Sequence, residues 1–305
     1  MQNKSSIDLS IILVNWNAKK LLKQCIESII NETKKVSYEI ILVDNNSTDG
    51  SAQMVEENFK SVVLIKNSEN RGFAAANNQA MKIAKGDYIL LLNSDTVVLN
   101  DALDKCYERI LGEDKIGLIG CKLLNSDMSL QPSCYNFNSL LNAIMFKTKA
   151  IKFINEKNRY KYEGLMQSFD YNTEMDVDYV CGAFMLYKRD ILEKVGFLDE
   201  SFFMYAEETD YCARIKEAGY RILFYPGAEI IHYGGGSSKK ISAISENRRI
   251  VSRLKFIKKH RGTMYYHLYR FLSTGNVLLN ILRSDTEMKK NYKSKLKAIR
   301  TMKYE

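Results

Sequence analysis

The chain has 305 residues, of which 46% are hydrophobic, and this length suits one large α/β domain with an appendage or two small domains. Its six cysteines lie far apart without a C-x-x-C pair, which excludes a disulfide-stapled secreted scaffold and favours a cytoplasmic location. The start lacks a signal-peptide pattern and no apolar run reaches roughly eighteen residues, which argues against export and against a membrane span.

Strand and helix patterns alternate through the first 124 residues. Apolar runs rich in β-branched residues at 9–14 and 38–43 flank a helix-like stretch at 19–30, which predicts a βαβ unit. The later elements of this pattern are a strand at 62–65, a helix at 73–84, a strand at 88–92, a helix at 102–111 and a strand at 117–124. The sequence therefore predicts an α/β fold with a mostly parallel central sheet flanked by helices.

The second half of the chain is less regular at first. Residues 125–176 show weak periodicity with interleaved aromatic and basic residues, and we interpret them as a substrate-facing insertion. Regular patterns return as a strand at 177–187, a helix at 208–218 ended by Gly219, and a strand at 220–225 stopped by Pro226.

Polar residues follow three of the predicted strands at the point where each strand ends. Asn15 and Asn17 follow the first, a run from Asp44 to Gly50 follows the second, and Asn93, Ser94 and Asp95 follow the strand at 88–92. In open parallel sheets ligands bind beyond the carboxyl ends of the strands, so we expect these clusters to meet. No G-x-G-x-x-G or P-loop pattern accompanies them, which argues against a Rossmann dehydrogenase and a P-loop kinase.

The two strand-end carboxylates have different expected roles. Asp44 suits hydrogen bonds from a ribose hydroxyl or a base N–H, although an ordinary turn would also favour aspartate. Asp95 is placed to bind a hard divalent cation, Mg²⁺ or Mn²⁺, that bridges to a diphosphate. The alternative for Asp95 is an N-cap of the following helix.

Further candidate residues lie before and after predicted helices. Arg71 and Gly72 precede a helix whose N-terminal N–H groups favour an anion, and Asn77 and Asn78 could face the same cleft or form an ordinary polar helix face. His232 follows an apolar strand and precedes three glycines that would let backbone approach a phosphate; the alternative is a structural histidine.

The segment 196–210 places five carboxylates among aromatic residues. Burial beside aromatic rings raises the pKa of a carboxyl group and improves it as a general base, which makes Glu207 and Glu208 candidates. All three acids of the first helical turn also complement the helix dipole, and for Asp210 this structural role is the favoured interpretation.

The formal charge of +9 is concentrated at the C-terminal end. Residues 239–305 hold 18 Lys and Arg against 4 Asp and Glu, so we divide the chain into a catalytic domain at 1–238 and a basic helical extension at 239–305. Such asymmetry indicates an anionic partner, either a lipid surface or a nucleic acid; the alternative is a solvated, charged helical tail.

Seven motifs, in this order, resemble family 2 glycosyltransferases, especially their rhamnosyltransferase-like branch. They are VNWN at 14–17, VDNNSTDGS at 43–51, NRGFAAANN at 70–78, LLLNSDT at 90–96, CGAFMLYKRD at 181–190, GFLDESFFMYAEETDYCARIKEAGY at 196–220 and HYGGGS at 232–237. The resemblance covers roughly residues 8–260 and implies the GT-A fold, an α/β domain that binds a nucleotide sugar and a divalent cation, Mg²⁺ or Mn²⁺.

The resemblance also implies roles for individual residues. Asp44 corresponds to the acid that holds the nucleoside, Asp95 and His232 to the metal-binding residues, and Glu208 or Glu207 to the catalytic base. The remaining nucleotide-binding residues that it implies are Val14, Asn15, Asn17, Asn46, Arg71, Gly72, Asn77, Asn93 and Ser94. Two positions depart from the family pattern, because Ser94 replaces a common proline and Glu208 replaces a common aspartate.

The activity implied is inverting transfer of a sugar from a nucleotide donor to a hydroxyl of a cell-surface polysaccharide or lipid-linked glycan. The first choice of donor is dTDP-rhamnose, with UDP- and GDP-sugars as alternatives. The basic residues 248–259 and the apolar stretch 264–282 would then attach the enzyme peripherally to an anionic inner membrane surface.

Two other classes compete with this assignment. A sugar-phosphate nucleotidyltransferase is disfavoured because no glycine-rich loop with Arg and Lys follows the first strand. A non-catalytic nucleic-acid- or membrane-binding protein would leave the strand-end acids unexplained, and acids repel phosphate unless a cation intervenes, so no nucleic acid is expected as a partner.

Overall fold

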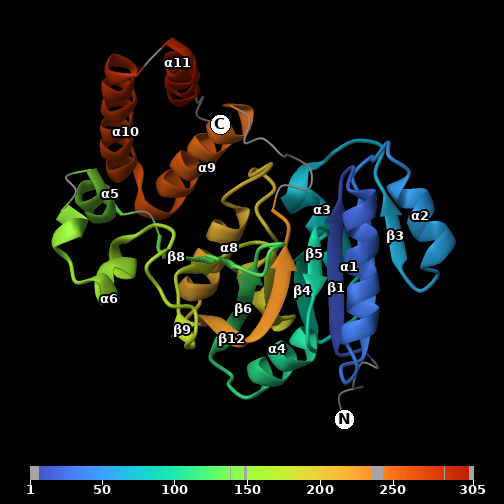
Figure 1. The fold of residues 1–305 in the computed structure, drawn as a ribbon. Coiled ribbons are helices and arrows are strands. Elements are labelled where there is room, and N and C mark those ends of the chain that lie inside the picture. Colours follow the sequence, from blue (N-terminus) through green and yellow to red (C-terminus); the bar gives the residue numbers. More distant parts are fainter. Residues whose placement is uncertain (1–6, 138, 148–149, 235–242, 285, 302–305) are drawn as a thin grey trace.

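The computed structural model describes residues 7–137, 139–147, 150–234, 243–284 and 286–301, and a mixed β-sheet forms its centre (Figure 1). The sheet begins with four parallel strands in the order β3 (Val63–Lys66), β2 (Tyr38–Asp44), β1 (Leu9–Asn15) and β4 (Tyr88–Asn93). β1 lies between β2 and β4, so its continuous apolar run is buried on both faces. The predicted α/β fold with a helix-flanked sheet is confirmed.

Beyond β4 the sheet becomes antiparallel. β11 (Phe184–Lys188) runs antiparallel to both β4 and β6 (Ile116–Leu124), and β12 (Arg221–His232) returns parallel to β6. The short strands are β5 (Thr96–Val98) and β9 (Met175–Asp176) against β12, β7 (Leu130–Gln131) against β6, and the separate pair β8 (Cys134–Tyr135) and β10 (Tyr179–Val180).

Helices cover both faces of the sheet and bury one apolar cluster on each. One cluster contains residues of α1 (Lys19–Glu32), α2 (Ser51–Asn58) and α4 (Ala102–Leu111). The other contains residues of α3 (Gly72–Met81), α7 (Asp190–Val195) and α8 (Glu207–Glu217). Helix α2 was missing from the predicted elements.

Two local predictions are wrong, and one alternative is excluded. The single strand expected at 177–187 is broken at Cys181–Ala183, where the backbone turns between β10 and β11. Pro226 does not end its strand, because β12 continues through a register shift between Tyr225 and Glu229, and a bulge tolerates a residue without an N–H. Asp95 does not cap a helix, since β5 follows it directly.

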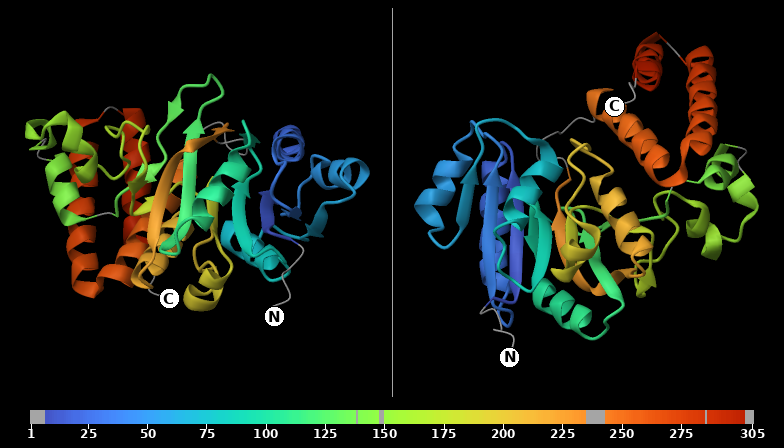
Figure 2. Two further views of the ribbon diagram at one scale, coloured as in Figure 1. Left: turned by 90° about the horizontal axis from the view of Figure 1, so that it is seen from below. Right: turned by 180° about the vertical axis from the view of Figure 1, so that it is seen from behind.

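The irregular insertion at 125–176 contains mostly short elements. Its helices are α5 (Leu140–Lys147), α6 (Glu156–Arg159) and the 3₁₀ turns at Ala150–Phe153 and Tyr160–Tyr162. The Tyr171 hydroxyl, buried below these elements, accepts hydrogen bonds from the backbone N–H groups of Ser133 and Cys134. Both views of Figure 2 place α5 and α6 beside the C-terminal helices.

The C-terminal extension is helical, as predicted, and consists of α9 (Ala243–Arg261), α10 (Thr263–Arg283) and α11 (Thr286–Thr301). These helices gather at the end of the molecule away from β1 and α1 (Figures 1 and 2). A third apolar cluster, which includes Phe202, Phe256 and Tyr266, joins α9 and α10 to the loop before α8. No described helix is both long enough and apolar enough to cross a bilayer.

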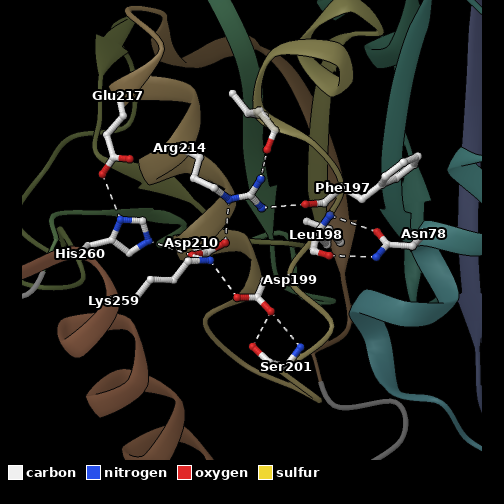
Figure 3. Close-up of polar contacts among 11 residues, drawn as sticks. Asn78, Phe197, Leu198, Asp199, Ser201, Asp210, Arg214, Glu217, Lys259 and His260 are labelled. Atoms are coloured by element: carbon white, nitrogen blue, oxygen red, sulfur yellow. Dashed lines mark hydrogen bonds and ion pairs between the residues drawn. The ribbon is translucent and has the colours of Figure 1, made fainter. Parts of the chain in front are cut away.

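A buried carboxylate fastens α9 to α8. Asp210 has no exposed surface, and its oxygens lie 2.9 Å from Arg214 Nε, 2.7 Å from Lys259 Nζ and 2.8 Å from His260 Nε2 (Figure 3). Burial raises the pKa of Asp210, but the bonds from His260 and Lys259 and the charge of Arg214 outweigh it, so the pKa is lowered. Asp210 therefore bridges two helices in addition to standing in the first turn of α8.

Candidate active site

A cavity of about 780 Å³ opens at the carboxyl ends of β1 and β4. Val14 and Trp16 line it from the end of β1, and Asn93, Ser94 and Asp95 line it from the end of β4. Its volume falls in the range of pockets that enclose ligands of nucleotide size. Polar residues meet as predicted after β1 and β2, where Asn15 bonds to Asp44, whereas the residues that β1 brings to this cavity are Val14 and Trp16.

Asp44, the acid at the end of β2, is held by hydrogen bonds from Asn15 and Ser47. Asn15 Nδ2 donates to Asp44 Oδ1 at 3.0 Å, and the backbone N–H of Ser47 donates to Asp44 Oδ2 at 2.9 Å. Asp44 is buried and is not among the residues that line the cavity, whereas Asn15 Oδ1 is buried without a hydrogen-bond partner within the described chain.

Asn17 and Asn46 shape the turns after β1 and β2. Both are exposed and have left-handed backbones, with φ of 53° and 63°, a conformation that asparagine tolerates better than most residues. Asn17 Oδ1 accepts a hydrogen bond of 2.7 Å from the backbone N–H of Thr48. Neither asparagine lines the cavity, so the structure brings both near the strand ends but not into the wall.

The loop before α3 is locked against the loop before α8. Gly72 has φ of +80°, and a Cβ at this position would lie 2.5 Å from the carbonyl oxygen of Phe203. The backbone N–H of Phe73 donates to that same oxygen at 3.1 Å. Gly72 lines the cavity, whereas the adjacent Arg71 is exposed and does not.

The two asparagines of α3 serve the helix and its packing. Asn77 Nδ2 donates to the carbonyl of Phe73 one turn earlier, and its side chain is buried away from the cavity. Asn78 is bonded to both the N–H and the carbonyl of Leu198, which ties α3 to the segment before α8 (Figure 3). The structure does not bring Asn77 to the site.

Asp95 and His232 face each other across the register of β5 and β12. Pairing of Thr96 with His232 sets His232 Nε2 3.4 Å from Asp95 Oδ1, with both side chains largely buried at the cavity wall. Asn93 Nδ2 also lies 3.4 Å from His232 Nε2. The neighbouring residues Gly235, Gly236 and Ser237 lie outside the described residues.

Gln131, which the sequence did not indicate, fixes the state of His232. Gln131 Nε2 donates to the carbonyl of His232 and to Asn125 Oδ1, so its Oε1 must be the atom 2.7 Å from His232 Nδ1. Nδ1 therefore carries a hydrogen, and Nε2 is the nitrogen that faces Asp95.

This donor set fits a divalent cation. An imidazole lone pair and a carboxylate oxygen repel each other at 3.4 Å unless a proton or a cation lies between them. Within the described chain no group of three or more His, Cys, Asp and Glu residues could hold a metal. Asp95 and His232 thus supply two ligands, and a diphosphate and water would have to supply the others.

Glu207 and Glu208 line the same cavity at the start of α8. Burial raises the pKa of both, and the charge of Glu208 raises the pKa of Glu207 further. Glu207 is buried, and its Oε2 has no hydrogen-bond partner in the part of the chain described; Glu208 is half-buried. Tyr205 and Ala206, with φ of 72° and 70°, store backbone strain just before this pair.

The other wall of the cavity comes from α9. Arg248, Arg249 and Arg253 line it, whereas the sequence had assigned these residues to a lipid surface. The apolar cluster and Asp210 hold α9 against the enzyme body, and contact of its arginines with a lipid surface stays a prediction. A smaller cavity of about 270 Å³, lined by Lys216 and Arg261 among others, contains none of the predicted site residues.

Residues 10–196 match the model of the family described as "Glycosyl transferase family 2". The chain belongs to this family. Its predicted assignment to family 2, with similarity to a rhamnosyltransferase, is therefore confirmed.

Two curated relatives of this family 2 glycosyltransferase cover it to different extents. The N-acetylglucosaminyl-diphospho-decaprenol L-rhamnosyltransferase of Mycobacterium tuberculosis is 24% identical over 75% of this chain and 77% of its own length. The poly(ribitol-phosphate) beta-glucosyltransferase of Bacillus spizizenii is 38% identical over 32% of this chain and only 16% of its own length.

Solved structures support the fold of the family 2 glycosyltransferase. The mannosyltransferase PcManGT of Pyrobaculum calidifontis, in complex with GDP-Man and Mn²⁺, has a TM-score of 0.59 and 16% identity over 98% of this chain and 86% of its own. TarS of S. aureus has a TM-score of 0.55 and 15% identity over 96% of this chain and 80% of its own. The predicted GT-A fold is confirmed.

Proposed function

We propose that the protein transfers a sugar from a nucleoside diphosphate sugar to a hydroxyl of a carrier-linked glycan, with inversion at the anomeric carbon. The observation that carries this proposal is that Asp95, His232 and Glu208 line one cavity at the ends of the parallel strands. A cation-binding pair and a general base are the two functions that such a displacement needs from side chains.

The donor side of the site is the wall formed by β1, β4 and the loop before α3. Trp16 offers an exposed aromatic face, and Asn15, Asn93 and Ser94 supply polar groups near it. Asp44 would bind the nucleoside only after a change in the network that now buries it. Our first choice of donor remains dTDP-rhamnose, supported by similarity to the mycobacterial rhamnosyltransferase, with UDP- and GDP-sugars as alternatives.

Asp95 and His232 would hold the divalent cation, Mg²⁺ or Mn²⁺. When bound, the cation would neutralise charge on the departing nucleoside diphosphate. Gln131 keeps His232 in the tautomer that such binding requires, and the cation in the Pyrobaculum calidifontis mannosyltransferase complex supports a metal in this fold.

Glu208 is the base that the structure favours. Burial and the charge of Glu208 raise the pKa of Glu207 well above its ordinary value, so we assign the role of proton acceptor to the half-buried Glu208. Glu208 takes the acceptor proton while the acceptor oxygen bonds to the anomeric carbon and the bond to the diphosphate breaks. Burial raises the pKa of the Cys181 thiol to about 11, so this nearby group is a poor nucleophile, in agreement with direct displacement.

The acceptor would be a cell-surface polysaccharide or lipid-linked glycan, and an anionic membrane surface would be a partner. The names of the two relatives, which specify a diphospho-decaprenol-linked sugar and a ribitol-phosphate polymer, support a carrier-linked acceptor. The membrane partner is supported by an exposed apolar face on α10 and by α11, whose sequence holds six basic residues and one acid.

The test is a thermal-shift panel with dTDP-, UDP- and GDP-sugars, with and without Mn²⁺. A ligand that binds the folded state alone raises the melting temperature, so one nucleotide should raise it and should require the cation. Asp95→Ala should lose the cation-dependent part of the shift. Asp127→Ala, which removes an exposed acid outside the cavity, is the matched control and should behave as the wild type.

Three outcomes are informative. A cation-dependent shift with one nucleotide, lost in Asp95→Ala alone, supports the transfer site and names the donor class. An equal shift in Asp95→Ala removes Asp95 from the metal site. No shift with any nucleotide sugar contradicts the proposed function.

A further inference from the structure

One face of α9 forms a positively charged wall of the cavity. Its lining residues recur at helical spacing, so they share one stripe of the helix: Ser245, Arg248, Arg249, Arg253 and Phe256. All three arginines are exposed, which leaves them accessible to a ligand in the cavity.

The three arginines form no short ion pair within the described residues, although the charge of Arg249 acts on Glu208 and Glu246. Within the described residues none of the three has a carboxylate within 4.0 Å. Other basic residues of α9 are engaged, since Lys259 pairs with Asp199 and Asp210, and Lys255 Nζ donates to the carbonyl of Ser201. Three guanidinium groups at one wall, without a short ion pair in the described part of the chain, attract an anion.

Two of the arginines are held by aromatic rings. Arg248 Cζ lies 5.1 Å from the ring centre of Phe203, and Arg249 Cζ lies 4.7 Å from that of Tyr205. An aromatic ring stabilises a guanidinium group without using its N–H donors. Those donors therefore stay available for the paired hydrogen bonds that a phosphate group accepts.

The position of these arginines points to the acceptor rather than the donor. Arg249 and Glu208 line the same cavity, and the positive charge of Arg249 opposes the rise that burial causes in the pKa of Glu208. The base must reach the acceptor hydroxyl. The donor diphosphate already has its own place at Asp95 and His232, so a second anionic group in this cavity would belong to the acceptor.

We propose that Arg248, Arg249 and Arg253 form a phosphate-binding site for the acceptor, which is therefore a phosphate ester. This inference rests on the proposed function, because it assigns the second substrate of the same cavity. The phosphate would come from a lipid carrier or from a phosphate-containing polymer, and both present the same chemistry to the arginines.

The experiment measures binding of farnesyl phosphate and glycerol 3-phosphate by titration calorimetry, with farnesol and glycerol as neutral counterparts. The full-length wild type is compared with Arg249→Gln/Arg253→Gln and with the control Arg283→Gln, which removes an exposed arginine at the end of α10. Each titration is run without nucleotide and with saturating UDP, dTDP or GDP plus Mn²⁺. Quenching of Trp16, the sole tryptophan, reports nucleotide binding separately.

We expect the wild type and Arg283→Gln to bind a phosphate ester but not its neutral counterpart. The double variant should keep its melting temperature and its nucleotide affinity but bind the ester at least about tenfold more weakly. Preference for farnesyl phosphate would indicate a lipid carrier, and preference for glycerol 3-phosphate a phosphate polymer.

Two results would overturn the proposal. One is loss of nucleotide binding in the double variant, which would assign the arginines to the donor diphosphate. The other is failure of the wild type to bind either ester under any of these conditions. If no nucleotide binds at all, the proposed function fails instead, and the titrations without nucleotide still decide whether the arginines bind phosphate.

Discussion

Two adjacent residues, Glu207 and Glu208, are chemically identical but differ in their surroundings. Glu207 is buried and carries an oxygen without a hydrogen-bond partner in the described chain, whereas Glu208 is half-buried and close enough to Arg249 to be affected by its charge. The backbone strain at Tyr205 and Ala206 places both carboxyl groups at the cavity. The position along α8 thus separates a buried wall residue from the half-buried candidate base.

Glu208→Gln should reduce kcat/KM by about 10²- to 10⁴-fold, because it removes the proton acceptor and keeps the shape. Glu207→Gln is the matched control and should keep most of the activity, since Glu208 is assigned as the base and the pKa of Glu207 is raised well above its ordinary value. Burial raises the pKa of Glu208, so wild-type activity should fall with decreasing pH from a point above the ordinary value of 4.5. Initial rates measured across a pH range check the effects of both variants and the pH dependence of the wild type. A greater loss of activity in Glu207→Gln than in Glu208→Gln would make Glu207 the base.

Single residues also show how far the sequence could predict the site. Asp95 and His232 were both indicated because each follows an apolar strand, but their proximity depends on the register of β5 against β12. Gln131 escaped notice because it lies in a strand of two residues with no hydrophobic pattern. Asn77 was expected at the site, but its amide reaches its own helix backbone instead.

At the scale of elements, the packing of α9 on the enzyme body makes part of the C-terminal extension a wall of the cavity. Its apolar residues pack on Phe202 and Ala213, and its Lys259 and His260 converge on Asp210. Neither contact is local in sequence, so composition alone indicated a charged tail but not the wall of a cavity. The strands at the N-terminal end were predictable because each carries its own periodicity.

Asp210→Asn should lower the free energy of unfolding by about 1.5–3 kcal/mol, because it removes the buried negative charge to which Arg214 and Lys259 are bonded. Chemical denaturation at pH 6 measures the change. The folded-state pKa of Asp210 is lowered, so its contribution is present above its ordinary pKa of 3.8 and is lost as the pH falls through the folded value. Glu56→Gln breaks an exposed pair with Lys66 and should change stability by less than about 1 kcal/mol.

Helix α10 presents an apolar stripe to solvent. Phe271 and Leu282 are 75% and 78% exposed, and the exposed apolar residues recur on one face: Met264, Leu268, Phe271, Leu278, Leu279 and Leu282. A helix with such a face next to basic residues can lie in the interface of an anionic membrane. The membrane partner thus depends on α10 and α11 rather than on the arginines of α9.

Replacing Leu268, Phe271 and Leu282 together by serine should lower sedimentation with phosphatidylglycerol-containing vesicles by at least about tenfold, since each side chain contributes apolar transfer energy. Leu111→Ser, which changes an exposed leucine on α4, should sediment as the wild type. Substitution is preferable to truncation, because removing α9 would also remove a wall of the cavity. Equal sedimentation of all three proteins would contradict the membrane proposal.

For the whole molecule, the architecture followed from the order of its elements more readily than from their details. Alternating strands and helices predicted the parallel half of the sheet, because consecutive βαβ units have few ways to pack. The antiparallel insertion of β11 between β4 and β6 was not predictable, since its partners are distant in sequence. The end of the last predicted strand was misplaced at Pro226 for the same reason. Pro226 lies in a bulge of β12, and the strand that pairs with this bulge, β6, is distant in sequence.

The cavity is assembled from separate stretches of the chain, and this has an evolutionary consequence. Apart from His232, the wall assigned to the donor comes from the first hundred residues, whereas the arginines assigned to the acceptor come from α9. Changes in α9 can therefore alter which acceptor is glycosylated while the sugar that is transferred stays the same. A lineage of such enzymes could diversify its glycans one substrate at a time.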